Sequence, residues 1–222
     1  MARIAGLYVI IDPAACRGRN PVDVAAAALE GGASVIQWRD KLRNKGEQLP
    51  DAAAIYDLCI DHDAAFIVND HADLALVLDP RHKLVGALGV HLGQTDLPLD
   101  AVKLIVPGSF IVGVSTNNPD EARAAEAGGA AYVAVGDLFG TATKEGTRAA
   151  SPQRLAEVRA AVRLPVVGIG GINLTNVLEV AAAGANAIAV ISAVCAADDP
   201  KAAARDLLAA FEGGTGHRGI GL

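Results

Sequence analysis

The amino-acid sequence predicts an α/β protein of the single (β/α)8 class, a TIM barrel. Short apolar segments alternate with alanine-rich amphipathic segments along the 222 residues, which is the order of a chain built from strand–helix units. The apolar segments contain few polar residues, as parallel strands covered on both faces do. Polar residues directly follow several of them, where active sites of this fold lie. A doubly wound open sheet also explains the repeats, but it does not predict functional residues after so many strands.

The predicted strands are the apolar segments, at Gly6–Asp12, Ala33–Trp38, Ala65–Val68, Ala87–His91, Phe110–Val114, Ala131–Val135, Pro165–Gly168 and Ala187–Ile191. The predicted helices lie between and after them, at Val22–Glu30, Gly46–Asp61, Ala72–Leu78, Leu99–Ile105, Pro119–Ala127, Pro152–Ala161, Leu174–Ala183 and Lys201–Phe211. We expect one catalytic domain over residues 1–212 and a flexible tail over the glycine-rich residues 213–222.

Composition limits the partners of the protein. A net charge of −6 and a pI near 5.3 argue against binding of nucleic acid or anionic membranes. No apolar run approaches the ~20 residues of a membrane span, and the residues after Met1 lack the layout of a signal peptide. Cys16, Cys59 and Cys195 are odd in number and have no metal-ligand spacing. A reduced, cytoplasmic protein is therefore expected.

The second strand ends in a cationic segment, Gln37-Trp38-Arg39-Asp40-Lys41. Because side chains alternate along a strand, Gln37, Arg39 and Lys41 should share one face, opposite Trp38 and Asp40. Arginine offers a planar donor fork and lysine a mobile charge, a combination suited to a diphosphate. The alternative is a surface strand end with ordinary ion pairs.

Carboxylates follow the third and fourth strands. Asp70 comes directly after Val68-Asn69, and Asp96 ends the segment that begins at His91. Together with waters and phosphate oxygens, two such carboxylates can hold Mg²⁺ without a complete protein cage. The alternatives are that Asp70 caps the following helix and that Asp96 is a turn residue.

The last two strands predict a phosphate site. Val166–Ile172 is an apolar strand that runs into a glycine turn, and the strand Ala187–Ile191 ends at Ser192. Glycine or serine beside a helix start leaves backbone N–H groups open to an anion. In (β/α)8 barrels a phosphate site is commonly formed by the loops after strands seven and eight.

Taken together, the ordered motifs resemble thiamine-phosphate synthase along nearly the whole chain, from Gly6 to Phe211. The motifs are Gln37-Trp38-Arg39-Asp40-Lys41, Val68-Asn69-Asp70, Gly89–Asp96, Gly113-Val114-Ser115, Thr141–Lys144, Gly168–Ile172 and Val190-Ile191-Ser192. This family is a (β/α)8 barrel that joins hydroxymethylpyrimidine diphosphate to hydroxyethylthiazole phosphate with Mg²⁺, releasing pyrophosphate. The resemblance implies that the C–O bond to diphosphate breaks first and gives a pyrimidine-methyl cation, which the thiazole nitrogen captures.

The resemblance also implies residue roles. Arg39, Lys41, Asn69 and Lys144 would bind the diphosphate, and Asp70 and Asp96 would bind Mg²⁺. Gln37, His91 and Ser115 would lie at the pyrimidine, and Thr141, Thr143, Gly171, Ile191 and Ser192 would hold the thiazole phosphate. The groups that act in catalysis would be Arg39, Lys41, Ser115 and Lys144.

The loop after the sixth strand departs from the family pattern. This chain reads Gly136-Asp137-Leu138-Phe139-Gly140-Thr141 and lacks two prolines common in the family. Their loss leaves the backbone less restricted, and Asp137 adds a negative charge near the diphosphate. We therefore expect residues 137–147 to be mobile without substrates and to close over them.

Two other functions remain open at this point. A thiazole tautomerase shares the barrel but does not need the diphosphate and Mg²⁺ residues. A non-catalytic barrel could bind thiazole or thiamine phosphates as a sensor. The expected partners are small molecules, with a homo-oligomer possible.

Overall fold

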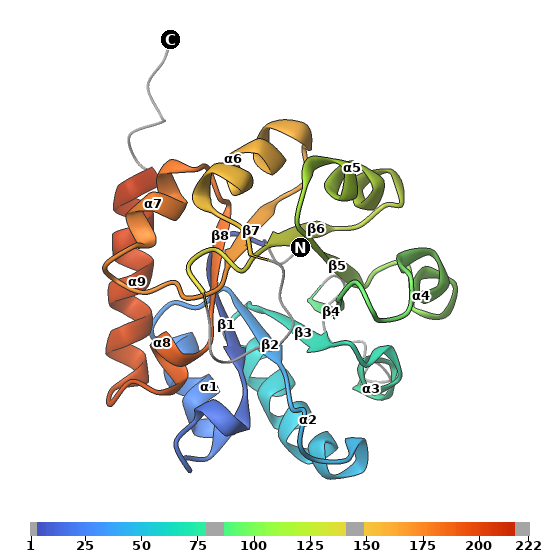
Figure 1. The fold of residues 1–222 in the computed structure, drawn as a ribbon. Coiled ribbons are helices and arrows are strands. Elements are labelled where there is room, and N and C mark those ends of the chain that lie inside the picture. Colours follow the sequence, from blue (N-terminus) through green and yellow to red (C-terminus); the bar gives the residue numbers. More distant parts are fainter. Residues whose placement is uncertain (1–3, 79–86, 141–148, 216–222) are drawn as a thin grey trace.

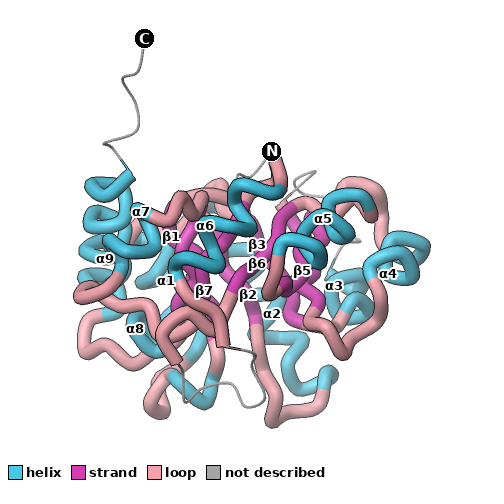
Figure 2. Tube along the Cα trace, turned by 45° about the horizontal axis from the view of Figure 1, so that its top comes forward, coloured by secondary structure: helices cyan, strands magenta, loops and turns pink. Residues whose placement is uncertain are grey.

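Eight parallel strands close into a barrel in the order of the sequence, from β1 to β8. The computed structural model describes residues 4–78, 87–140 and 149–215. The barrel closes where β1 pairs with β8, with Gly6 opposite Ala187. Figure 1 shows the strands at the centre with helices around them, and the same two layers are visible in Figure 2. The predicted (β/α)8 barrel is confirmed.

The strands begin and end within two residues of their predicted positions. They are β1 (Gly6–Ile11), β2 (Val35–Trp38), β3 (Ala65–Asn69), β4 (Leu88–Leu92), β5 (Ile111–Thr116), β6 (Tyr132–Val135), β7 (Val166–Ile169) and β8 (Ala187–Val190).

The helices lie outside the strands. They are α1 (Pro21–Glu30), α2 (Lys45–Asp61), α3 (Ala72–Leu78), α4 (Leu99–Ile105), α5 (Pro119–Ala127), α6 (Pro152–Ala161), α7 (Val177–Ala182), α8 (Ser192–Cys195) and α9 (Pro200–Thr215), with a 3-10 turn η1 (Pro13–Ala15). Several begin at a polar cap: the side chain of Asn20 accepts the Val22 N–H, and that of Ser151 accepts the Arg154 N–H. Such caps satisfy N–H groups that the helix itself leaves open.

The structure adds two short helical elements to the predicted ones and corrects two predicted helix boundaries. The short elements η1 and α8 were not predicted, because a single turn is too short to show a periodic pattern. Helix α7 begins at Val177, three residues later than expected, since the Asn173 carboxamide accepts the Thr175 N–H in a local turn. Helix α9 continues to Thr215, beyond the predicted end at Phe211 and into the expected tail.

Two apolar layers follow from strand alternation. In β1, Leu7, Val9 and Ile11 pack in the larger core against the helices, whereas Tyr8 and Ile10 belong to a second cluster inside the barrel. Glycine makes room inside at one position in particular: a Cβ on Gly113 would lie 2.0 Å from the ring of Tyr132. The side chains inside the barrel therefore form the floor for whatever binds at the ends of the strands.

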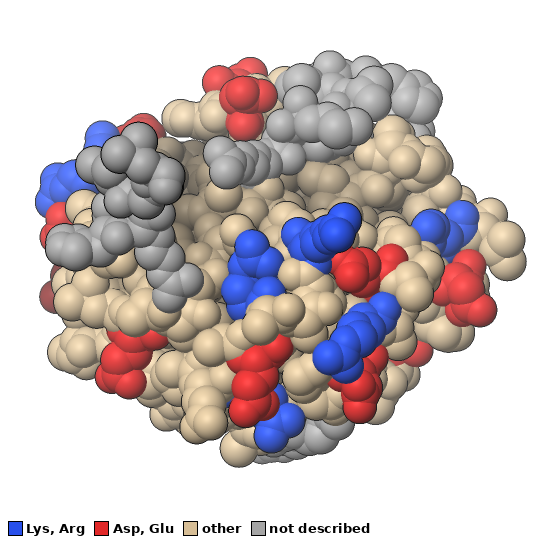
Figure 3. Space-filling view, turned by 90° about the horizontal axis from the view of Figure 1, so that it is seen from above, with Lys and Arg blue, Asp and Glu red and all other residues tan. Residues whose placement is uncertain are grey.

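The surface carries interspersed charges. On the face shown in Figure 3, basic side chains lie next to acidic ones rather than gathering in one basic area. Exposed ion pairs such as Lys201–Glu30, at 2.8 Å, are part of this pattern. In the parts of the chain that the structure describes, no helix is long and apolar enough to cross a membrane.

Candidate active site

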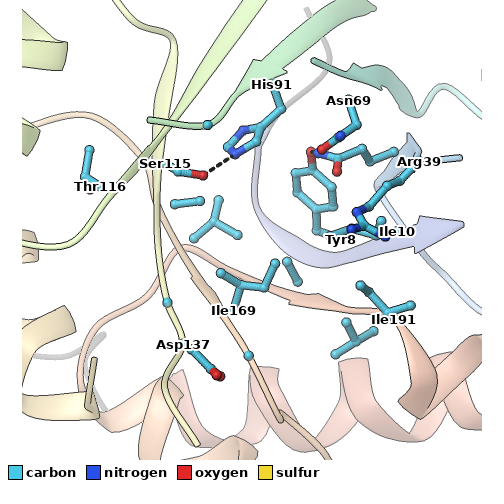
Figure 4. Close-up of a pocket in the computed structure, with 18 of the residues that line it drawn as sticks. Tyr8, Ile10, Arg39, Asn69, His91, Ser115, Thr116, Asp137, Ile169 and Ile191 are labelled. Carbon is cyan, nitrogen blue, oxygen red and sulfur yellow. Dashed lines mark hydrogen bonds between the residues drawn. The ribbon is translucent and has the colours of Figure 1, made fainter. Parts of the chain in front are cut away.

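One cavity of about 320 Å³ opens at the carboxyl ends of the strands. Every strand contributes to its lining, so residues distant in the sequence meet there. The predicted site residues that the structure describes all line it: Gln37, Arg39, Lys41, Asn69, Asp70, His91, Asp96, Ser115, Gly171, Ile191 and Ser192. Thr141, Thr143 and Lys144 lie outside the described residues. Figure 4 shows Tyr8, Asn69 and Arg39 on one side of this cavity and His91 and Ser115 on another.

The end of β2 follows the predicted alternation. Gln37, Arg39 and Lys41 line the cavity, whereas the Trp38 indole donates to Gln48 of α2 at 3.1 Å. Asp40, on the same side as Trp38, accepts the Arg43 Nε–H at 2.5 Å. The alternation continues past the last strand residue and turns both cations toward the cavity.

A buried carboxylate that the sequence analysis did not single out holds Arg39. Asp12, at the end of β1, is 4% exposed and forms a salt bridge with the Arg39 guanidinium. Its other oxygen accepts the Ala14 N–H at 3.0 Å, which fixes the carboxylate at the start of η1. Arg39 is therefore held in place before any ligand arrives. The available signal was the position of Asp12 directly after an apolar strand, the same signal that identified Asp70.

Lys41 has a different environment. Its ammonium pairs with Asp70, but about half of its side chain remains exposed. Asp70 has a φ of 61°, and its backbone N–H donates to the His91 carbonyl at 2.9 Å. This unusual backbone conformation for a non-glycine residue is held by the neighbouring strand. It places the Asp70 carboxylate at the cavity.

Asp70 and Asp96 both line the cavity, and their carboxyl groups influence each other's ionisation. Burial and the neighbouring Asp70 raise the pKa of Asp96. Burial opposes ionisation of Asp70 as well, but the hydrogen bonds from Lys41 and Asp96 lower the pKa of Asp70. Two carboxylates this close need a shared proton or a cation between them. Hard oxygen donors of this kind fit Mg²⁺, with waters and phosphate oxygens completing its shell.

The loops after β7 and β8 meet at the cavity, at the position predicted for a phosphate cradle. Gly170 and Gly171 have φ values of 103° and 65°, and a Cβ on Gly171 would lie 2.4 Å from the Gly140 carbonyl oxygen. Only glycine fits both the conformation and the close approach. The N–H groups of Gly171 and Ser192 make no hydrogen bond to another described residue. They are thus available to an anion.

Beneath the strand ends, five side chains form a hydrogen-bonded chain. Gln37 Nε2 donates to Tyr8 Oη at 2.6 Å, and Tyr8 Oη lies 2.9 Å from Tyr132 Oη. Tyr132 Oη lies 2.9 Å from His91 Nδ1, and His91 Nε2 lies 2.9 Å from Ser115 Oγ. Burial raises the pKa of both tyrosines, so both hydroxyls keep their protons. The sequence analysis missed Tyr8 and Tyr132, which resemble core residues in apolar strands.

The described part of the loop after β6 is tied to β7. Leu138 and Phe139 donate backbone N–H groups to Ile169 and Gly170, both at 3.1 Å. Asp137 lines the cavity, where a Cβ on Gly170 would lie 2.2 Å from its Oδ1. The carboxylate thus lies beside the cradle. The expectation of a mobile loop falls mainly on residues 141–147, outside the described residues.

The geometry defines a class of protein: a (β/α)8 barrel whose cavity, at the carboxyl ends of its strands, is lined by two cations, a carboxylate pair and the glycine turn after β7. The protein-family model described as thiamine monophosphate synthase matches residues 7–194 of this chain. The chain belongs to this family, and it is an enzyme of the transferase class.

Individual relatives agree with the family. The chain is 47% identical over 201 residues to the thiamine-phosphate synthase of Methanospirillum hungatei, across 90% of this chain and 94% of that protein. It is 43% identical to the thiamine-phosphate synthase of Shouchella clausii, and the match covers 93% of this chain and 96% of that protein. The solved thiamine phosphate pyrophosphorylase from Pyrococcus furiosus has a TM-score of 0.84 and 37% identity, and the match covers 95% of this chain and 96% of that chain.

Proposed function

We propose that this chain is a thiamine-phosphate synthase, joining hydroxymethylpyrimidine diphosphate to hydroxyethylthiazole phosphate with release of pyrophosphate. One observation carries the proposal: a single cavity contains two separate groups suited to anions. The first is the cationic row of Arg39 and Lys41 beside the Asp70–Asp96 pair, and the second is the cradle near Gly171 and Ser192. A reaction between two phosphorylated substrates needs both.

The cationic end would bind the leaving diphosphate. Arg39 presents a fixed guanidinium and Lys41 a mobile ammonium, with the Asn69 amide beside them. Lys144, from the loop after β6, is proposed as a further cation. Preorganised charges stabilise a departing anion because they need no rearrangement as its charge develops. Asp70 and Asp96 would hold Mg²⁺, which when bound helps to neutralise the diphosphate.

The floor of the cavity would hold the pyrimidine. Gln37, His91 and Ser115 offer polar atoms there, and Ile10 and Ile169 add apolar walls. Such a floor can orient a polar ring while excluding water from the pyrimidine-methyl cation. No nucleophile from the protein is required, because the thiazole nitrogen attacks this carbon.

The cradle would hold the thiazole phosphate. Gly171, Ile191 and Ser192 line the cavity, and their backbone N–H groups would be the donors to the phosphate. Thr141 and Thr143 are proposed to add hydroxyl donors. The thiazole would then lie between its own phosphate and the pyrimidine. This arrangement directs the ring nitrogen at the carbon from which diphosphate departs.

The experiment uses the purified protein with both substrates and Mg²⁺, and follows thiamine phosphate and pyrophosphate. Formation of both products in equal amounts supports the synthase. Conversion of one thiazole tautomer into another without pyrimidine diphosphate would indicate a tautomerase instead. Binding of thiazole phosphate without turnover would indicate a sensor.

The remaining parts of the proposal concern the molecule as a whole. We propose that residues 1–212 form one domain, and one large apolar core joins the strands to their helices. A cytoplasmic location is supported by Cys16, Cys59 and Cys195, which are all free thiols. A homo-oligomer is part of the same proposal, with chromatography coupled to light scattering as its test.

A further inference from the structure

The chain of hydroxyls inside the barrel has two possible directions. Either each group donates from Tyr8 toward Ser115, or each donates from Ser115 toward Tyr8. Hydroxyls can take either role, and a neutral imidazole donates from one nitrogen and accepts at the other. The direction therefore determines the tautomer of His91 and the position of the hydroxyl proton of Ser115.

The structure fixes one end of this chain. Gln37 Nε2 donates to Tyr8 Oη at 2.6 Å, so Tyr8 already accepts one hydrogen bond. The other partner of Tyr8 among the described residues is Tyr132. Tyr132 in turn has Tyr8 and His91 as its described partners.

Counting protons separates the two directions. If donation runs toward Tyr8, the Tyr8 hydroxyl accepts twice and its own proton has no acceptor among the described residues. Tyr8 is only 2% exposed, and an unsatisfied buried donor is costly. If donation runs toward Ser115, the protons of Tyr8 and Tyr132 are both used. The proton left over is then that of Ser115, which is half-buried at the cavity and can reach water or a ligand.

We propose that Tyr132, which accepts from Tyr8, is a positioning residue that holds His91 as the Nε2–H tautomer and thereby directs the Ser115 hydroxyl proton into the cavity. Tyr132 donates to His91 Nδ1, and His91 Nε2–H donates to Ser115 Oγ. The ring of His91 is held by stacking on Tyr132, with centroids 5.5 Å apart and planes 23° apart. Ser115 is left as a hydrogen-bond donor to its ligand.

The direction of donation determines what Ser115 can recognise in the bound pyrimidine, a consequence that rests on the proposed function. A donor at this position favours a ligand atom with a free lone pair, such as a ring nitrogen of the pyrimidine. A ring with C–H at that position would leave the donor without a partner and bind less well. The Gln37 amide donates through Nε2 to Tyr8, so its oxygen remains as an acceptor. Together the two side chains distinguish a pyrimidine from an apolar ring of the same size.

The first test is ¹⁵N NMR of the ligand-free protein labelled at histidine, with the His91 signals assigned by their absence in His91→Asn. We expect Nε2 to be protonated and Nδ1 to have the shift of an unprotonated ring nitrogen. A protonated Nδ1, alone or together with Nε2, would overturn the proposal. This measurement needs no substrate, so its outcome is independent of the proposed function.

The second test compares variants that each remove one phenol oxygen. Tyr132→Phe removes the donor to Nδ1, so we expect a mixture of His91 tautomers and a KM for pyrimidine diphosphate raised roughly threefold to tenfold. Tyr8→Phe leaves the Tyr132–His91 bond in place and should retain a single tautomer. Equal tautomer shifts in both variants would contradict the assigned direction.

The third test separates positioning from a general structural role. Combined with Ser115→Ala, the Tyr132→Phe change should raise this KM no further, because the hydroxyl that it directs is absent. Ser115→Thr, which retains a hydroxyl, should restore most of the affinity. The KM for thiazole phosphate should stay constant throughout. Parallel increases in both KM values would overturn the proposal.

Discussion

Replacement of Asp12 by asparagine is the sharpest test of the cationic row. Asp12 and Arg39 form a salt bridge in which the two side chains are only 6% and 13% exposed. Asparagine has the same shape and can still accept the Ala14 N–H. The change therefore removes the negative charge and leaves both packing and the turn in place.

The magnitude follows from burial. Removal of one partner from a buried ion pair costs about 3–5 kcal/mol, because the remaining charge is left without compensation. We expect a loss of unfolding free energy at the lower end of this range, about 3 kcal/mol, because Arg39 lines an open cavity that water can enter. For a protein of this size, about 3 kcal/mol corresponds to a fall in Tm of roughly 6–12 °C. Pyrimidine diphosphate should also bind less well, because Arg39 loses its fixed orientation.

The assay is thermal unfolding together with KM measurements for both substrates. Asp198→Asn is the matched control, because Asp198 also pairs with an arginine, Arg17, but its side chain is 99% exposed. We expect no measurable change in Tm for this control. An Asp12→Asn protein as stable as the wild type would refute the reasoning. A KM that rises equally for both substrates would show that the site as a whole is altered.

Three further predictions concern individual parts of the site. Asp96→Asn should keep the fold but greatly lower Mg²⁺-dependent turnover, since an amide is a poorer ligand for a hard cation; unchanged activity would exclude Asp96 as a ligand. Lys41→Ala should weaken pyrimidine diphosphate binding by about 1.5–3 kcal/mol and leave thiazole phosphate unaffected, as titration calorimetry of each ligand can show. Gly171→Ala should weaken thiazole phosphate binding more than pyrimidine diphosphate binding, because a Cβ would lie 2.4 Å from the Gly140 oxygen at a φ of 65°; equal binding of thiazole phosphate by the variant would contradict the cradle.

The sequence could predict the residues at the strand ends because the topology brings them together. Once a parallel barrel is inferred, Arg39, Asp70 and Asp96 must lie at the same end, whatever their separation along the chain. Alternation along the strand then determines which side chains face the cavity. Gln37 faces it, whereas Trp38 points the other way, toward α2. These inferences need only the fold and the position of each residue within its strand.

The network inside the barrel could not be predicted in this way. Tyr8 and Tyr132 are 124 residues apart, and each lies in an apolar strand where an aromatic side chain normally indicates core packing. Their contact depends on Gly113, which leaves space for the Tyr132 ring. Nothing in the local sequence pattern distinguishes a tyrosine that packs from one that also relays a hydrogen bond.

The pairing of Lys41 with Asp70 would couple the binding of diphosphate to the binding of the metal. Arg39 is buried with Asp12 and can keep that partner when a diphosphate binds. Lys41 is half exposed, and its partner Asp70 belongs to the carboxylate pair proposed for Mg²⁺. A diphosphate that draws Lys41 away therefore frees Asp70 for the metal, and a metal at Asp70 likewise frees Lys41 for the diphosphate. If the proposed function holds, the diphosphate and the metal should each strengthen the binding of the other. The reason is that either ligand breaks the Lys41–Asp70 ion pair, which competes with both of them.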